Sequence, residues 1–256
     1  MPIGIYDSGI GGLTVYKAIA SKFKNLDMIY LGDSARVPYG NKSPETIIKY
    51  SLECSKYLAK RYNISALIVA CNTISSHALE ILHNELNIPV LGVILPGAKN
   101  AVDITKNNKI GVLATHATVN SKSYINAIKL INPNSQVYQQ ACPLFVPLVE
   151  EAFVDGEMVE TVVNESLKDI SKTDIDTLIL GCTHYPVLKP VIEKIMPNVK
   201  VIDSTEYIIN DINSLGIKLD ENGFRHILIT DQSHAFHSLK NLLVGNISVE
   251  LVEVGN

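Results

Sequence analysis

Two stretches of the chain share one pattern: an apolar run, a small residue, a Cys with polar residues after it, and then an amphipathic segment. They are ALIVACNTISSHALEIL, residues 66–82, and TLILGCTHYPVLKPVIE, residues 177–193. Cys71 and Cys182 thus each fall where a strand gives way to a helix, and a helix N-terminus lowers the pKa of a thiol. Taken alone, either Cys is explained as a small residue filling a turn. The repetition instead predicts two thiols that carry chemistry.

Other groups capable of proton transfer lie near a thiol or at another strand end. His184 follows Cys182 by two residues, so its imidazole can exchange a proton with the thiol or donate to a substrate oxygen. Asp7 and Ser8 end the first apolar run. The alternatives are that His184 is a surface or capping residue and that Asp7 only caps a helix.

The loop DSGIGG after the first apolar run has only part of a dinucleotide-binding pattern. Gly9 and Gly11 begin G-x-G-x-x-G, but Thr14 stands where the third glycine belongs, and no acidic residue follows the second strand at a convincing distance. We therefore expect no nucleotide cofactor. Backbone N–H groups of this loop, at a helix N-terminus, still offer a good seat for a carboxylate.

The remaining cysteines and histidines are interpreted as structural. Cys54 lies on one face of a predicted helix and Cys142 follows a strand, so both are predicted to be core residues. His77 and His83 lie on the helix after Cys71, on its predicted solvent face. No C-x-x-C or H-E-x-x-H spacing occurs, so neither a disulfide framework nor a metal site is expected.

Short β-rich runs alternate with amphipathic segments, which is typical of a parallel α/β fold. The predicted strands are IGIY, MIYL, ALIVA, IPVLGV, IGVL, QVYQ, TLIL and VKVI. A helix is predicted from Pro44 to about Arg61, because Ser43 supplies an N-cap, with a Pro and an acidic residue in the first turn. The long polar loop GDSARVPYGNKSPE before this helix is predicted to contact a ligand, the alternative being an ordinary connection.

The repeat extends to the strands, since IGIYDSG at Ile3 has a counterpart in IGVLATH at Ile110. It predicts two pseudo-symmetric lobes, each a small open parallel sheet flanked by helices, with the active site in the cleft between them. We assign residues 1–95 and 206–256 to the first lobe and 96–205 to the second. Pro96-Gly97 is the predicted turn between them, and HILIT and ISVELVEV are predicted strands that return to the first lobe.

Composition argues against a nucleic-acid-binding protein and against a membrane protein. The 256 residues are 46% hydrophobic and 19% charged, with no Trp and a formal net charge of −4, so a nucleic-acid partner is not expected. No apolar run approaches the length of a membrane span, and the N-terminus lacks a signal-peptide pattern, so a cytoplasmic, non-membrane protein is expected. The oligomeric state is open, with a homodimer as one option.

Two cysteines from equivalent lobes suit a reaction that needs a base on one face of a carbon and an acid on the other. One thiolate removes a Cα proton, the opposite thiol delivers a proton, and the roles exchange in the reverse direction. The residues therefore predict stereochemical inversion.

Over essentially its full length the chain carries motifs in an order known from one enzyme family. These are DSGIGG, GDSARVPYG, ACNT, GVILPGA, ACPLF, PLVEE and GCTHYP. In them the chain resembles the glutamate racemases, of the cofactor-independent aspartate/glutamate racemase superfamily. It departs from the family pattern at Ser34, where Thr is common, and at Ala152, where Gly often follows the paired glutamates.

The resemblance implies a role for each matching residue. It assigns Cys71 and Cys182 as the acid/base pair, assisted by Asp7 and His184 respectively. Its substrate-binding set is Asp7, Ser8, Tyr39, Gly40, Asn72, Thr73, Thr183 and His184, with Glu151 as an accessory acidic residue. It also implies that no PLP takes part.

The function implied by the resemblance is interconversion of L- and D-glutamate, which supplies D-glutamate for peptidoglycan synthesis. Three alternatives remain. The first is a racemase of the same superfamily for aspartate or another amino acid, although CTH rather than CTE favours glutamate by resemblance. The second is a hydrolase with one nucleophilic Cys, which leaves the Cys71 stretch unexplained. The third is a thiol redox or metal-binding protein.

Overall fold

The computed structural model describes residues 1–216, 223–232, 234–245 and 247–255. Its strands are β1 (Ile3–Asp7), β2 (Met28–Gly32), β3 (Ala66–Val69), β4 (Val90–Gly92), β5 (Lys109–Ala114), β6 (Gln136–Ala141), β7 (Thr177–Gly181), β8 (Lys200–Ile202), β9 (Arg225–Ile229) and β10 (Val249–Leu251). Its α-helices are α1 (Leu13–Lys22), α2 (Pro44–Tyr62), α3 (Asn72–His77), α4 (Leu79–Glu85), α5 (Ile94–Ile104), α6 (His116–Ser121), α7 (Ser123–Ile131), α8 (Phe145–Glu150), α9 (Glu157–Leu167), α10 (Lys189–Ile195), α11 (Thr205–Ser214) and α12 (His234–Val244). Short 3-10 helices are η1 (Ser34–Arg36), η2 (Tyr39–Asn41), η3 (Ile170–Lys172) and η4 (Tyr185–Leu188).

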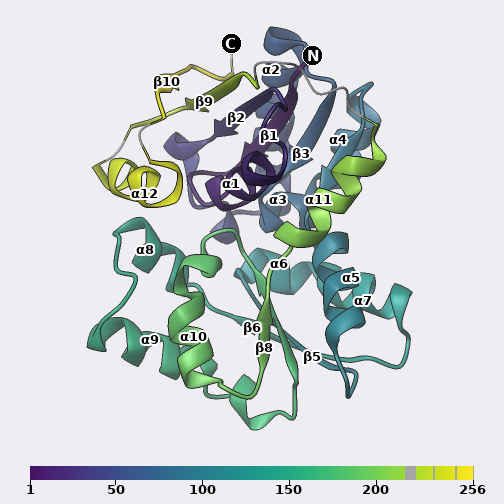
Figure 1. The fold of residues 1–256 in the computed structure, drawn as a ribbon, viewed down its shortest axis with the longest axis vertical. Helices are drawn as coiled ribbons and strands as arrows, with labels where there is room; N and C mark the ends of the chain where they lie inside the picture. The colour runs from purple at the N-terminus through teal and green to yellow at the C-terminus, as the bar shows by residue number, and fades with distance from the viewer. Residues whose placement is uncertain (217–222, 233, 246, 256) are drawn as a thin grey trace.

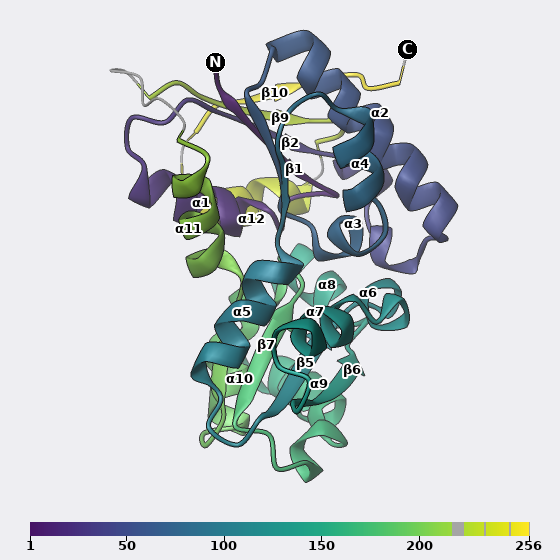
Figure 2. The same cartoon turned by 90° about the vertical axis from the view of Figure 1, so that its right-hand side faces the viewer.

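The predicted α/β fold with parallel sheets is confirmed, and every strand predicted between residues 3 and 202 is present. One sheet has six strands in the order β10-β9-β2-β1-β3-β4, and the other has four in the order β6-β5-β7-β8. Figures 1 and 2 show the two sheets in separate halves of the molecule, one above the other, each flanked by helices. The order β2-β1-β3-β4 matches β6-β5-β7-β8 strand for strand, so the internal repeat of the sequence is a repeat of topology.

The C-terminal strands extend the first sheet. Strand β9 pairs in parallel with β2, and β10 pairs with β9. Residues 217–222, 233, 246 and 256 of the predicted returning segment lie outside the described residues. The lobe limits at residues 95 and 205 remain our proposal.

Pro96 and Gly97 do not form the predicted turn between lobes. They lie in the first turn and a half of α5, which begins at Ile94 directly after β4. A Pro is tolerated there because the first N–H groups of a helix have no partner within the helix. The chain therefore passes from the first sheet to the second through a helix.

Local sequence explains why these elements form where they do. Ser43 caps α2 by accepting a hydrogen bond from the Thr46 N–H at 3.3 Å, and the helix ends at Asn63, which adopts a left-handed conformation. Strands β1, β2, β3 and β7 are buried along their whole length, as expected for parallel strands covered on both faces. Cys54 and Cys142 are fully buried, which confirms both as core residues.

Within the described residues, no helix combines the length and the apolar character needed to cross a lipid bilayer.

Two glycines in neighbouring strands test how tightly the first sheet is packed. A Cβ on Gly32 would lie 2.1 Å from the carbonyl oxygen of Gly9, whereas a Cβ on Gly4 would meet the terminal Cδ1 of Ile64 at 2.6 Å. A side chain can rotate away but a backbone carbonyl cannot, so we expect Gly32→Ala to lower the free energy of unfolding by about 3 kcal/mol or more and Gly4→Ala by about 1 kcal/mol. Urea denaturation of both variants measures the difference. Equal losses of stability in the two variants would contradict the inference that the Gly9 carbonyl is held rigidly against Gly32.

Candidate active site

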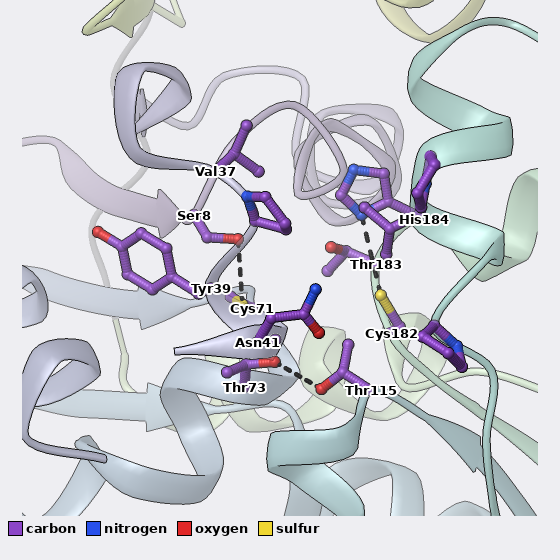
Figure 3. Close-up of a pocket in the computed structure, with 15 residues that line it drawn as sticks. Ser8, Val37, Tyr39, Asn41, Cys71, Thr73, Thr115, Cys182, Thr183 and His184 are labelled. Atoms are coloured by element: carbon purple, nitrogen blue, oxygen red, sulfur yellow. Dashed lines mark hydrogen bonds between the residues drawn. The ribbon is translucent and has the colours of Figure 1, made fainter. Parts of the chain in front are cut away.

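The two cysteine-tipped stretches meet at one cavity between the sheets. Cys71 follows β3 and Cys182 follows β7, the equivalent strand of the second sheet, and both line the cavity. Figure 3 shows Cys71 with Ser8 on one side of this space and Cys182 with His184 on the other. Ligand sites of open parallel sheets form at the carboxyl ends of the strands, and here two such ends share one site.

Cys71 is a buried thiol beside a buried carboxyl group. Its Sγ lies 3.5 Å from Ser8 Oγ. Burial, and after it the charge of Asp7, raise the pKa of Cys71 to about 12, although the hydrogen bond with Ser8 partly opposes the rise. The predicted lowering of the pKa by the helix N-terminus is thus outweighed, because α3 spans only residues 72–77 and the thiol is shielded from water. Cys71 holds its proton at neutral pH in this structure.

Cys182 belongs to a chain of three groups that can pass a proton. His184 Nδ1 lies 3.8 Å from Cys182 Sγ, and His184 Nε2 lies 2.9 Å from Glu150 Oε1. Burial alone would lower the pKa of His184, but its hydrogen bonds with Cys182 and Glu150 raise that pKa to about 10. The imidazole is therefore protonated at neutral pH.

Asp7 lies behind the cavity wall rather than on it. Its carboxylate accepts from the Gly9 N–H at 3.0 Å and from Thr183 Oγ1, of the second lobe, at 3.3 Å. Burial raises the pKa of Asp7, and the charge of His184 and these hydrogen bonds counteract that rise. The glycine loop packs directly against the second lobe, where a Cβ on Gly11 would lie only 2.5 Å from His184 Nδ1. Its glycines allow the lobes to approach.

The cavity gathers most of the predicted substrate-binding residues. Those that line it are Ser8, Tyr39, Gly40, Thr73, Thr183 and His184. Asn72 is buried next to them but lies off the cavity wall, where its Oδ1 accepts a hydrogen bond from Tyr124.

The hydroxyl of Tyr39 is turned away from the cavity, as Figure 3 shows. It donates to the buried carboxylate of Asp33 and lies 3.1 Å from the hydroxyl of Tyr6. Tyr39 thus presents its ring and backbone, rather than its hydroxyl, to the site. The loop predicted to contact a ligand does reach the cavity, held there by this buried network.

Among the site residues that the sequence analysis missed, two carry polar groups of chemical interest. Thr115 lines the cavity, and its Oγ1 lies 2.9 Å from Thr73 Oγ1 across the lobes (Figure 3). It directly follows β5 as Ser8 directly follows β1, so the repeat contained the signal. The acidic residue at His184 is Glu150, whereas the predicted Glu151 is exposed. Glu150 follows the lining residues Val146 and Pro147 at helical spacing, which places all three on one face of α8.

No group of three or more His, Cys, Asp or Glu side chains suited to hold a metal ion occurs in the part of the chain that the structure describes.

Two repeated parallel α/β lobes with one thiol each at a shared cavity define the class of protein. The chain belongs to the Asp/Glu/Hydantoin racemase family, whose sequence model matches residues 3–212.

Individual relatives are similar over nearly the whole chain. A glutamate racemase from Sulfurihydrogenibium sp. (strain YO3AOP1) is 54% identical over 256 residues, which are 100% of this chain and 98% of the relative. The structure of a glutamate racemase isoform from Bacillus anthracis superimposes with a TM-score of 0.93 at 36% identity, covering 98% of this chain and 97% of that one. A glutamate racemase from Francisella tularensis in complex with D-glutamate gives a TM-score of 0.92 at 40% identity, with the same coverage.

The contact between His184 and Glu150 makes a prediction about pH. We expect Glu150→Gln to lower the pKa of His184 by about 1 or more, because a hydrogen-bonded negative charge is removed. NMR titration of the imidazole measures this, with Glu151→Gln as the matched control that leaves the pKa unchanged.

Stability should follow the same titration. The folded-state pKa of about 10 exceeds the ordinary 6.5, so the stabilisation by the charged imidazole is complete below pH 6.5 and is lost as the pH rises through 10. Glu150→Gln should therefore lose less stability than the wild type between pH 7 and pH 10. An unchanged pKa in Glu150→Gln would contradict this assignment.

Proposed function

We propose that this protein interconverts L- and D-glutamate by proton transfer at Cα, with Cys71 and Cys182 as the two acid/base groups and without a cofactor. One observation carries the proposal: thiols from equivalent positions of two repeated sheets line a single cavity. Glutamate as the substrate is supported by the relatives, which are named glutamate racemases. The role that we propose is supply of D-glutamate for peptidoglycan synthesis in the cytoplasm.

In the proposed mechanism each thiol serves one face of the substrate. One sulfur, as thiolate, takes the Cα proton, and the other, as thiol, delivers a proton to the opposite face. Asp7 beside Cys71 and His184 beside Cys182 supply and remove the protons that set each sulfur in the required state. The reverse reaction exchanges the two roles, which suits a pair of lobes with the same topology.

Apart from the protonated imidazole of His184, the substrate would be held by neutral donors. None of the described side chains lining the cavity is Lys or Arg, whereas Ser8, Thr73 and Thr183 present hydroxyl groups there. The N-terminus of α3 adds backbone N–H groups beside Cys71. Fixed donors of this kind stabilise the negative charge that develops next to the α-carboxylate when the proton leaves Cα.

The alternatives are separated by specific observations. A hydrolase needs one thiol, so the second thiol in the same cavity favours a racemase. Turnover of aspartate and glutamate measured side by side decides between the two amino acids.

Serine at either cysteine position is expected to abolish racemisation. A hydroxyl is far too weak an acid to exchange protons as a thiol does, so Cys71→Ser and Cys182→Ser should each lose activity by orders of magnitude in both directions. Cys54→Ser, a buried cysteine outside the cavity, is the matched control. A chiral assay with each enantiomer measures the rates, and substantial turnover by either variant would refute the two-thiol assignment.

The origin of the new Cα hydrogen separates two bases from one. In D₂O the donating thiol exchanges with solvent before the substrate arrives, so the product should carry deuterium. Recovered substrate should carry little at early times, since the thiol that took its hydrogen returns that hydrogen. Mass spectrometry after chiral separation, started from each enantiomer, measures the label. Retention of protium in the product, or equal early labelling of substrate and product, would contradict the mechanism.

A further inference from the structure

Tyr124 touches both cysteine-tipped units at once. It lies on α7 in the second lobe, fully buried, and its hydroxyl reaches Asn72 of the first lobe with an O···O distance of 2.7 Å to Oδ1. Its ring packs on Gly181, the residue before Cys182, where a Cβ would come within 3.0 Å of the ring. One side chain thus contacts the residue after Cys71 and the residue before Cys182.

The ring has little freedom to move. A Cβ on Gly97 of α5 would lie 3.1 Å from the Tyr124 hydroxyl oxygen and 3.3 Å from Cε1. A side chain at either glycine would crowd the ring, so the two glycines let the backbone pack against it on both sides, and a packed core resists displacement. The Tyr124 hydroxyl is therefore held in a fixed position next to Asn72.

The hydroxyl proton determines which way the Asn72 amide faces. Among the described residues, Asn72 Oδ1 is the acceptor that the structure gives to this buried hydroxyl, so the hydroxyl donates and Oδ1 accepts. The amide Nδ2, for which the described residues provide no acceptor, is then the free end, and it is a donor. A flipped amide would instead turn an oxygen toward a substrate carboxylate and repel it.

We propose that Tyr124 is a positioning residue that fixes the Asn72 amide as a donor to the substrate's α-carboxylate and holds this donor in register with Cys182. The inference rests on the proposed function, in which a carboxylate binds beside both thiols. Asn72 is not itself on the cavity wall, but its chain neighbours Cys71 and Thr73 are, so its amide lies within one residue of the bound substrate in this proposal. Because Nδ2 is oriented before the substrate arrives, binding avoids the entropy cost of ordering it.

Tyr124→Phe removes one oxygen and keeps the ring. We expect the Kd for D-glutamate, measured by calorimetry, and the KM for both enantiomers to rise about tenfold, because the freed amide loses its orientation and its Oδ1 loses a buried partner. We expect kcat to change less. A merely structural role would lower the melting temperature or the active fraction, and so lower kcat with KM and Kd unchanged.

Two further variants isolate the effect. Tyr16→Phe is the matched control, since Tyr16 is buried and its hydroxyl has no hydrogen-bond partner among the described residues, so its Kd and KM should stay at the wild-type values. In an Asn72→Ala background, Tyr124→Phe should weaken D-glutamate binding no further, because its effect runs through Asn72.

The outcomes separate this inference from the proposed function. Wild-type affinity in Tyr124→Phe, or additive losses in the double variant, would overturn the positioning role while racemisation by the wild type stands. If the wild type binds D-glutamate without racemising it, the proposed function fails and the Kd comparison still decides the role of Tyr124. If the wild type does not bind glutamate, both are overturned.

Discussion

The structure depends on one constraint: the carboxyl ends of two separate sheets must keep a fixed position relative to each other across a shared cavity. Reacting groups act only when they lie about 3 to 3.5 Å from the atoms that they attack, so a small slip between the lobes would disable a site divided between them. The contacts that join the lobes beside the cavity include short polar ones, such as Thr73 with Thr115 and Thr183 with Asp7. Since they are buried, an unpaired member would be costly, and this favours the joined arrangement.

The repeated topology supports two chemically different halves. Cys71 has a hydroxyl and a carboxyl group as neighbours, and burial keeps its thiol protonated. Cys182 has a protonated imidazole, which is itself held by a carboxylate from α8. The backbone therefore supplies geometric symmetry, while the side chains around each sulfur give the two sides separate proton sources.

Much of this arrangement could be predicted from sequence because it depends on local patterns. Apolar runs of strand length specified the parallel strands, and the repeated cysteine stretch indicated a pair of thiols. Other features depend on tertiary packing. The choice between Glu150 and Glu151 follows from the face of α8 that meets His184, and the high pKa of Cys71 follows from burial. The Pro96-Gly97 pair was misinterpreted as a turn because the same residues also fit the start of a helix.

The route of the chain between the sheets bears on how the two sulfurs are held opposite each other. The chain leaves the first sheet through α5 and returns through α11, and these two helices lie against each other, with an ion pair between Lys99 and Asp211. Two crossings that pack against each other constrain the relative placement of the two sheets more than a single crossing would. The alignment of the two sulfurs is therefore set partly by helices that lie outside the cavity.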